Sequence, residues 1–303
     1  MKNILSKIQN GFLFGIYRIK PKFFFYSFYS YFEKYTASPQ ITGLKFSKNT
    51  KVAKKEEIIY LPNDVQITWQ LMRYGELNYP ISKIIKNKLN NRKKYTFIDI
   101  GANVGLVSRQ LFYENKNIEN YVCVEPAKMT FDCLVKNTAL LKKVSLHNIG
   151  LGQKNETKNI FIDKSNHGNA SLEKTMMSLS KYKNYKVEKI TVMSVKSFFK
   201  KIRKDIKGKK LIIKIDTQSL DELIISLIPD EIIKNTVLLN YELTSVKGVR
   251  KQKISVKNFK SKLSKFEKIW SEDINNINSD WLAQNYESSE NKENIETDIY
   301  LMK

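Results

Sequence analysis

From Tyr95 to the end of the chain, short apolar runs alternate with segments of helical length, and this alternation restricts the fold more than any other feature of the sequence. Apolar strands separated by helices indicate a mainly parallel sheet that helices cover on both faces. We therefore predict an α/β protein with a Rossmann-like, mostly parallel seven-stranded sheet. The expected strands are Tyr95–Ile100, Tyr121–Val124, Val144–Asn148, Leu211–Ile215, Thr236–Tyr241, Phe266–Trp270 and Asp298–Met302, and the expected helices are Val104–Tyr113, Lys128–Leu141, Val195–Arg203, Ser219–Ile228 and Ser255–Leu263.

Two further short strands, near Lys158–Asp163 and Val187–Met193, interrupt the alternation. We expect this insertion to lie over the carboxyl edge of the sheet, where substrate contacts are often found. Residues 284–297 are polar and predict an exposed loop.

The chain before the alternating region divides into two parts. Residues 1–38 interleave aromatic rings with lysines, a combination that suits a membrane interface; a helical arm packed on the main body or on a partner subunit is the alternative. Residues 39–94 contain turn residues and short apolar runs and end in a predicted helix, Ile81–Leu89. We expect them to form a lead-in layer before the main domain, residues 95–303.

The formal net charge of +23 raises the question of anionic partners. The lysines are scattered singly and serve solubility as readily as recognition, so we predict no specific nucleic-acid partner. No stretch supplies the roughly 20 apolar residues that cross a bilayer, and no small-residue cleavage site follows the apolar N-terminal stretch. We expect a cytoplasmic protein that can contact the inner face of the membrane peripherally through residues 1–38.

The sequence contains two cysteines and two histidines. These are too few for a disulfide scaffold or for a metal centre rich in cysteine or histidine. We predict that Cys123 and Cys133 are buried free thiols, that His147 is structural, and that the protein has no metal ligand.

The sharpest local pattern is the apolar strand Phe97–Ile100, which runs into a glycine turn and then into a helix. Gly101 allows a tight turn and the close approach of a ligand, and the start of the helix presents free amides. The spacing fits neither the dinucleotide motif nor the phosphate-binding loop. Asp99 would repel a pyrophosphate but attract an ammonium group, and S-adenosylmethionine carries such a group. We therefore predict that Asp99, Gly101 and Asn103 contact this cofactor.

A second carboxylate follows the next strand, in Val124-Glu125-Pro126. The two oxygens of one carboxylate match the two hydroxyl groups of a ribose, so Glu125 is the expected ribose ligand. The alternative for the two motifs together is a helix cap at Asp99 or Asn103 and an ordinary surface glutamate.

These motifs resemble the FkbM family of methyltransferases. The resemblance covers the chain from about Leu61 to the C-terminus and rests on five motifs: Asp99–Gly105, Val124–Pro126, Ile149–Gly152, Gly168–Leu172 and Ile213–Asp216. It implies a class I S-adenosylmethionine-dependent fold, a cofactor site that also includes Gly105, Pro126 and Gly150, and O-methylation of a hydroxyl group on a sugar, polysaccharide or related metabolite.

The sequence departs from the family pattern after the fourth strand of the main domain. The family commonly has Lys-Ile-Asp-Val-Glu-Gly-x-Glu there, whereas this chain has Lys214-Ile215-Asp216-Thr217-Gln218-Ser219-Leu220-Asp221. Gln218 stands where a carboxylate is usual and Ser219 where a glycine is usual. The neutral Gln218 weakens the case for a metal or a base at that position.

O-methylation requires alignment of the hydroxyl oxygen with the methyl group and removal of the hydroxyl proton. Asp216, at the carboxyl end of a strand, is the first candidate for the general base, and Glu242 is the second. His167 is the third, because its unperturbed pKa suits proton transfer near neutral pH. Asp216 could instead orient the acceptor without taking its proton.

Two other functions remain open from the sequence. The basic chain could methylate RNA or protein, although no added RNA-binding module or aminomethylation motif is evident. It could also be a non-catalytic scaffold that binds the cofactor and is anchored by residues 1–38.

Overall fold

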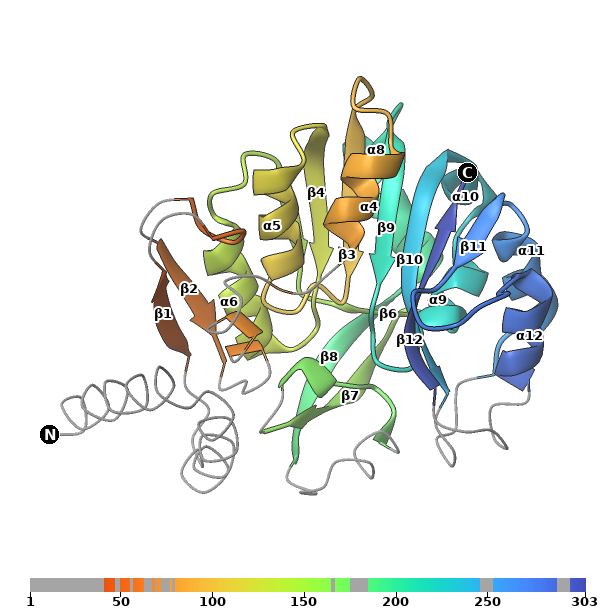
Figure 1. The fold of residues 1–303 in the computed structure, drawn as a ribbon. Helices are drawn as coiled ribbons and strands as arrows, with labels where there is room; N and C mark the ends of the chain where they lie inside the picture. Colours follow the sequence, from red (N-terminus) through yellow and green to blue (C-terminus); the bar gives the residue numbers. More distant parts are fainter. Residues whose placement is uncertain are drawn as a thin grey trace, which may run out of the picture.

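The computed structural model describes residues 41–46, 50–54, 57–62, 67–68, 70–71, 77, 80–164, 167–174, 185–245, 253–287 and 295–303. A seven-stranded sheet runs through the middle of the molecule (Figure 1). Its strands, in spatial order, are β11 (Lys268–Trp270), β12 (Ile295–Met302), β10 (Thr236–Ser245), β9 (Lys210–Ile215), β3 (Tyr95–Ile100), β4 (Ile118–Val124) and β5 (Val144–His147).

The sheet is mostly parallel. Neighbouring strands from β10 to β5 pair in parallel, and only β12 runs against its neighbours β10 and β11. The helices are α4 (Ile81–Lys88), α5 (Leu106–Glu114), α6 (Lys128–Thr138), α7 (Val195–Lys201), α8 (Arg203–Ile206), α9 (Asp221–Leu227), α10 (Asp230–Asn235), α11 (Val256–Leu263) and α12 (Ser279–Glu287). The predicted fold class, an α/β protein with a mostly parallel seven-stranded sheet, is confirmed.

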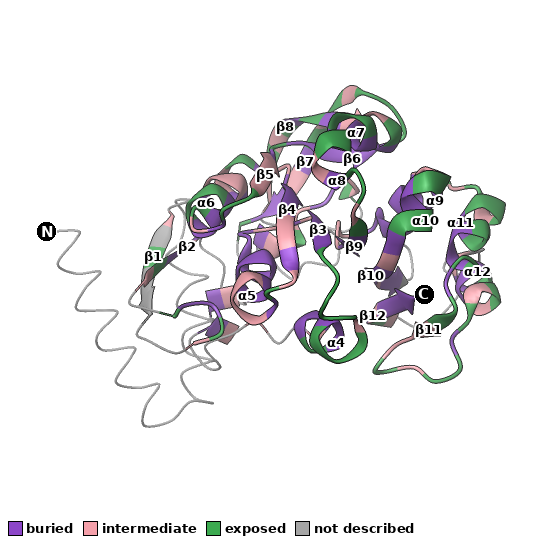
Figure 2. Ribbon diagram, turned by 90° about the horizontal axis from the view of Figure 1, so that it is seen from above, coloured by how far each residue is buried: buried purple, intermediate pink, exposed green. Residues whose placement is uncertain are grey.

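The side chains of β3 pack alternately into two hydrophobic cores, one on each face of the sheet. Tyr95 and Phe97 pack in the core with α4, α5 and α6, whereas Ile98 and Ile100 pack in the core with α7 to α12. All six residues of β3 are buried, because a central parallel strand is covered on both faces. Figure 2 shows the helices on both sides of the buried strands.

Several predicted boundaries differ from the structure, and two of the differences change how an element is assigned. The expected helix Val195–Arg203 is divided at Ile202 into α7 and α8. The expected loop 284–297 is helical up to Glu287 and is a strand from Ile295, while residues 288–294 lie outside the described ones. The polar sequence did not predict α12 because this helix is stabilised by packing against α11. The rings of Tyr286 and Phe259 lie 6.3 Å apart at that contact.

The insertion after β5 forms a separate three-stranded sheet. It consists of β6 (Gly150–Gly152), β8 (Tyr185–Ser194) and β7 (Glu156–Asp163), in that spatial order. A short 3₁₀ helix, η1 (His167–Asn169), follows β7. In Figure 1 this unit lies below the ends of β3 and β9, as the sequence predicts.

The lead-in region contributes a two-stranded antiparallel sheet, β1 (Thr42–Phe46) and β2 (Glu57–Leu61), which the sequence analysis did not assign as strands. Two buried polar residues connect β2 to the main domain. Arg109 of α5 donates to Glu57 at 2.6 Å, and Asn137 of α6 bonds both backbone groups of Tyr60.

Residues 39–40 and the predicted arm, residues 1–38, lie outside the described residues. None of the helices in the described ranges combines the length and hydrophobicity needed to cross a membrane.

Candidate functional site

A cavity of about 420 Å³ lies at the carboxyl edge of the main sheet, next to the insertion. Its wall is formed by the turn after β3, the end of β4, the segment 149–151, the segment 167–170 and the ends of β9 and β10. Ligands bind at this edge in open parallel sheets. The cavity therefore collects residues that are far apart in the sequence.

Gly101 begins the turn after β3. Its φ of +78° is unfavourable for other residues, and a Cβ atom there would lie 1.8 Å from the backbone oxygen of Asp216. The amide of Asp216 donates to the carbonyl of Ile100 at 2.9 Å, which holds the ends of β3 and β9 together. Only glycine fits this approach, so the turn places Asp216 next to the glycine loop.

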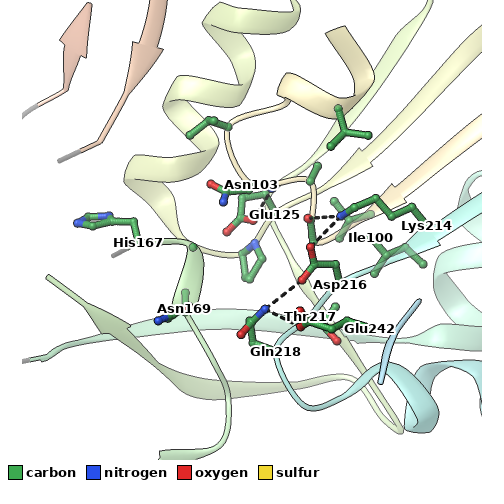
Figure 3. A pocket seen from close by; sticks show the side chains of 18 of the residues that line it. Ile100, Asn103, Glu125, His167, Asn169, Lys214, Asp216, Thr217, Gln218 and Glu242 are labelled. Atoms are coloured by element: carbon green, nitrogen blue, oxygen red, sulfur yellow. Dashed lines mark hydrogen bonds and ion pairs between the residues drawn. The ribbon is translucent and has the colours of Figure 1, made fainter. Parts of the chain in front are cut away.

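Glu125 lies at the end of β4, with both carboxylate oxygens held by backbone amides. Oε2 accepts from the amide of Asn103 at 3.0 Å, and Oε1 accepts from the amide of Ala127 at 2.9 Å. Burial raises the pKa of Glu125 to about 7, and the two amide bonds act in the opposite direction. Each carboxylate oxygen can accept a further bond, and Glu125 lines the cavity next to Asn103 (Figure 3).

Asp99, the expected ligand for an ammonium group, lies behind this wall. Its side chain is fully buried and is not part of the cavity lining. It accepts from the hydroxyl of Ser108 at 2.9 Å and pairs with the ammonium of Lys214 at 3.5 Å. Burial raises the pKa of Asp99, and Lys214 opposes that effect.

Lys214 connects this buried acid to the cavity. Its ammonium nitrogen lies 3.1 Å from Oδ2 of Asp216 and 3.4 Å from the carbonyl oxygen of Gly101. Burial alone would lower the pKa of Lys214, but Asp216 and Asp99 raise it above its usual value. Lys214 is therefore a charged ammonium group in the cavity wall.

The end of the cavity next to Lys214 is rich in carboxylates. Four acidic residues line it: Asp216 directly after β9, Glu242 of β10, and Glu296 and Asp298 of β12. Glu242 and Asp298 are directly opposite in the β10–β12 register. Burial and the charges of Asp216 and Asp221 raise the pKa of Glu242 to about 9, so this side chain is protonated at neutral pH. In the described part of the chain, no group of three or more His, Cys, Asp or Glu side chains is arranged to hold a metal ion.

The side chain of Gln218 bridges Asp216 and Glu242, the first two candidates for the general base. Its Nε2 atom donates to Oδ1 of Asp216 at 3.1 Å and to Oε2 of Glu242 at 2.9 Å (Figure 3). The structure thus brings Asp216 and Glu242 together, because their strands β9 and β10 are adjacent and parallel.

His167 also lines the cavity but does not join that pair. Figure 3 shows its ring on the other side of Glu125 from Asp216. Burial lowers the pKa of His167 to about 4, and its Nδ1 atom has no hydrogen-bond partner among the described residues. The imidazole is neutral near pH 7 and is a weak base.

The remaining predicted cofactor residues divide into two groups. Pro126 and Gly150 line the cavity, whereas Gly105 does not. A Cβ atom on Gly105 would lie 2.5 Å from the side chain of Leu134, so this glycine lets α5 approach α6 closely.

Lys214, Glu296 and Asp298 line the cavity but are not among the site residues predicted from the sequence. A lysine inside the apolar strand Leu211–Ile215 is a pattern that could have found Lys214, because a buried lysine needs an acidic partner. Glu296 and Asp298 face the cavity through the pairing of β12 with β10, which the local sequence does not specify.

No family model matches the sequence, and no curated protein matches it. Several solved structures align with the chain at low sequence identity. Methyltransferase FkbM from Methylobacillus flagellatus KT is 13% identical, with a TM-score of 0.35, and the alignment covers 79% of this chain and 54% of that chain. A SAM-dependent methyltransferase from Leishmania major is 9% identical, with a TM-score of 0.34 and coverage of 73% of this chain and 70% of that chain. A SAM-dependent methyltransferase from Agrobacterium tumefaciens is 8% identical, with a TM-score of 0.35 and coverage of 88% and 71%.

Proposed function

We propose that this protein is an S-adenosylmethionine-dependent methyltransferase of the FkbM type that methylates a hydroxyl group of a sugar, polysaccharide or related metabolite. One observation carries the proposal: all five motifs of the family resemblance contribute to the lining of a single cavity. Their lining residues include Gly101, Glu125, Gly150, Asn169 and Asp216. Segments as far apart in the sequence as those of Gly101 and Asp216 would not meet there without the predicted fold.

The wall of the cavity fits the chemical groups of this cofactor. Glu125 offers two oxygens to a pair of ribose hydroxyls, and the apolar side chains of Ile149, Leu151 and Ile160 suit a purine ring. Asn103 Oδ1 and His167 Nδ1 are buried without hydrogen-bond partners among the described residues. A polar ligand in the cavity would provide such partners. The acidic end of the cavity suits a cation. The cofactor supplies a methyl group that its positive sulfur already activates.

Asp216 is the first candidate for receiving the acceptor's proton. The acceptor oxygen bonds to the methyl carbon while the carbon–sulfur bond breaks, leaving its electron pair on sulfur, and the hydroxyl proton passes to the base. Glu242, with a pKa raised to about 9 by burial and neighbouring acids, is already protonated at neutral pH. His167 is a weak base on the far side of Glu125. Asp216 lines the cavity with its side chain 27% exposed, so an acceptor can reach it.

Calorimetry with S-adenosylmethionine and S-adenosylhomocysteine tests the cofactor, and transfer of a labelled methyl group tests the acceptor. We expect both compounds to bind and label to appear in free sugars or polysaccharide. Failure to bind either compound at millimolar concentration would reject the proposal. Label in RNA or protein would favour the alternative acceptors, and binding without transfer to any of these pools would favour a cofactor-binding scaffold.

A further inference from the structure

We propose that Gln218 is a positioning residue for methyl transfer, which uses its amide group to hold the carboxyl groups of Asp216 and Glu242 in one arrangement. This inference rests on the proposed function, because it assigns Asp216 the proton-accepting role. It extends that function to a residue where the family pattern has a carboxylate.

The two oxygens of Asp216 are held by different donors. Lys214 lies 3.1 Å from Oδ2, and the amide of Gln218 lies 3.1 Å from Oδ1. A carboxylate with a donor on each oxygen cannot rotate freely about its last bond, so the remaining acceptor positions keep a fixed direction in the cavity. Gln218 also reaches Glu242 at 2.9 Å, which fixes the second acid relative to the first.

The backbone around Gln218 adopts an unusual conformation. Gln218 has a φ of +53° and Ser219 a φ of +100°, values that residues other than glycine rarely adopt. Strained conformations persist where the surrounding structure holds them, and they concentrate at functional sites. Here the hydroxyl of Ser171 donates to the carbonyl oxygen of Gln218 at 2.8 Å and lies 3.3 Å from the hydroxyl of Ser219.

Ser171 belongs to the insertion, so the insertion helps to hold the backbone from which the Gln218 side chain extends. The backbone of Ser171 is in turn bonded in both directions to Phe161 of β7, at 2.9 Å for each bond. A chain of contacts therefore leads from the small sheet through Ser171 and Gln218 to Asp216 and Glu242.

The neutral amide suits the charge around it better than a carboxylate would. An amide donates to both acids, whereas a third carboxylate would repel them and favour their protonated forms. Those protonated forms cannot accept a proton from the acceptor. The charged groups that act on Asp216 and Glu242 from the surrounding elements are Lys214 of β9, Asp99 of β3, Glu125 after β4, Asp221 of α9, and Glu296 and Asp298 of β12.

Two substitutions separate positioning from a merely structural role. Gln218→Met keeps the length of the side chain but removes both hydrogen bonds, and Gln218→Glu keeps the shape but adds a negative charge. We expect kcat to fall at least about 10-fold at pH 7 in each variant, with KM for the cofactor within about 2-fold of the wild type. We also expect the acid limb of the kcat–pH profile to move upward by about one pH unit, and further in Gln218→Glu than in Gln218→Met.

The control is Gln153→Glu, which makes the same chemical change at an exposed position outside the cavity lining, so the pH profile should be unchanged. If the Gln218 variants do not fold, Ser171→Ala leaves the glutamine in place and should move the profile in the same direction by a smaller amount. Unchanged pH profiles with a uniform loss of rate at every pH would overturn the inference, because loss of structure alone has that effect.

A second measurement does not depend on cofactor or acceptor. Carbon-13 NMR titration of labelled carboxyl groups, with Glu242→Gln to identify its signal, should show Glu242 titrating at higher pH in Gln218→Met than in the wild type. Identical titrations would overturn the inference even where methyl transfer is observed. Shifted titrations in a protein that does not bind S-adenosylmethionine would instead show that the proposed function failed while the coupling of the three side chains stands.

Discussion

The ammonium group of Lys214 lies 3.5 Å from Oδ1 of Asp99, and both side chains are almost completely removed from solvent. A buried acid that loses its cationic partner is strongly destabilising, because no solvent replaces the lost interaction. We expect Lys214→Met to lower the free energy of unfolding by about 3 kcal/mol, as measured by urea denaturation.

The double variant Asp99→Asn/Lys214→Met separates the buried charge from the packing of Lys214. It removes both charges, so we expect it to recover at least about 1 kcal/mol of the loss. A double variant as unstable as Lys214→Met would mean that the lost packing, and not the unpaired acid, causes the destabilisation.

The bonds between Glu125 and the amides of Asn103 and Ala127 lead to a prediction for cofactor affinity. Glu125→Ala should weaken binding of S-adenosylmethionine by about 1–3 kcal/mol in calorimetry, the range for leaving charged hydrogen-bond partners unmade. Because burial raises the pKa of Glu125 to about 7, affinity should also weaken as the pH falls from about 8 to about 6, when the carboxylate takes up a proton. Glu272→Ala, at an exposed position, is the control. An affinity that Glu125→Ala leaves unchanged would remove Glu125 from the cofactor site.

Glu242 makes the stability of the protein depend on pH. Its pKa is raised by burial to about 9 in the folded protein, from 4.5 when unperturbed, so between these values the folded state binds a proton that the unfolded state does not. Stability from this group is therefore full below about pH 4.5 and falls as the pH rises to about 9.

Glu242→Gln removes this titration and should make the decrease shallower, by at most about 1.4 kcal/mol per pH unit. The remaining slope comes in part from Asp221 and Glu125, whose pKa values burial raises to about 7. Denaturant unfolding at several pH values measures the slope. The same slope in both proteins would contradict the raised pKa of Glu242.

The sequence predicted those parts of the fold that are encoded locally. The strand Tyr95–Ile100 matches the structure residue for residue, because an apolar run that ends at a glycine turn marks its own boundary. Helix α12 was missed because its stability depends on contacts with α11, such as that between Tyr286 and Phe259. Local pattern carries little information on such partners.

The same distinction applies to the site. Glu125 and Asp216 stand at strand ends, where the position in the sequence already places them at the carboxyl edge. Asp298 enters the cavity only through its register opposite Glu242, which involves residues 56 positions apart. The backbone of Gln218 is held by Ser171 of the insertion, 47 positions away, and a single motif does not contain that contact.

The last prediction concerns Asp216, the proposed base. Asp216→Asn keeps the size of the side chain but removes its basicity, so kcat should fall by roughly 10² or more while the affinity for S-adenosylmethionine changes little. Lys214 and Gln218 each contact a different oxygen of Asp216, so in the variant one of them faces an amide NH2 group in place of an acceptor. Denaturation and calorimetry must therefore accompany the rates, with Asp132→Asn as the matched control, because Asp132 of α6 is also paired with a lysine and lies outside the cavity lining. Turnover near the wild-type rate from about pH 6 to 9 would reject Asp216 as the base. Glu242 or His167 would then have to remove the proton. Glu242 is protonated below about pH 9, and His167 is a weak base. Alignment of the acceptor would therefore have to supply most of the rate enhancement.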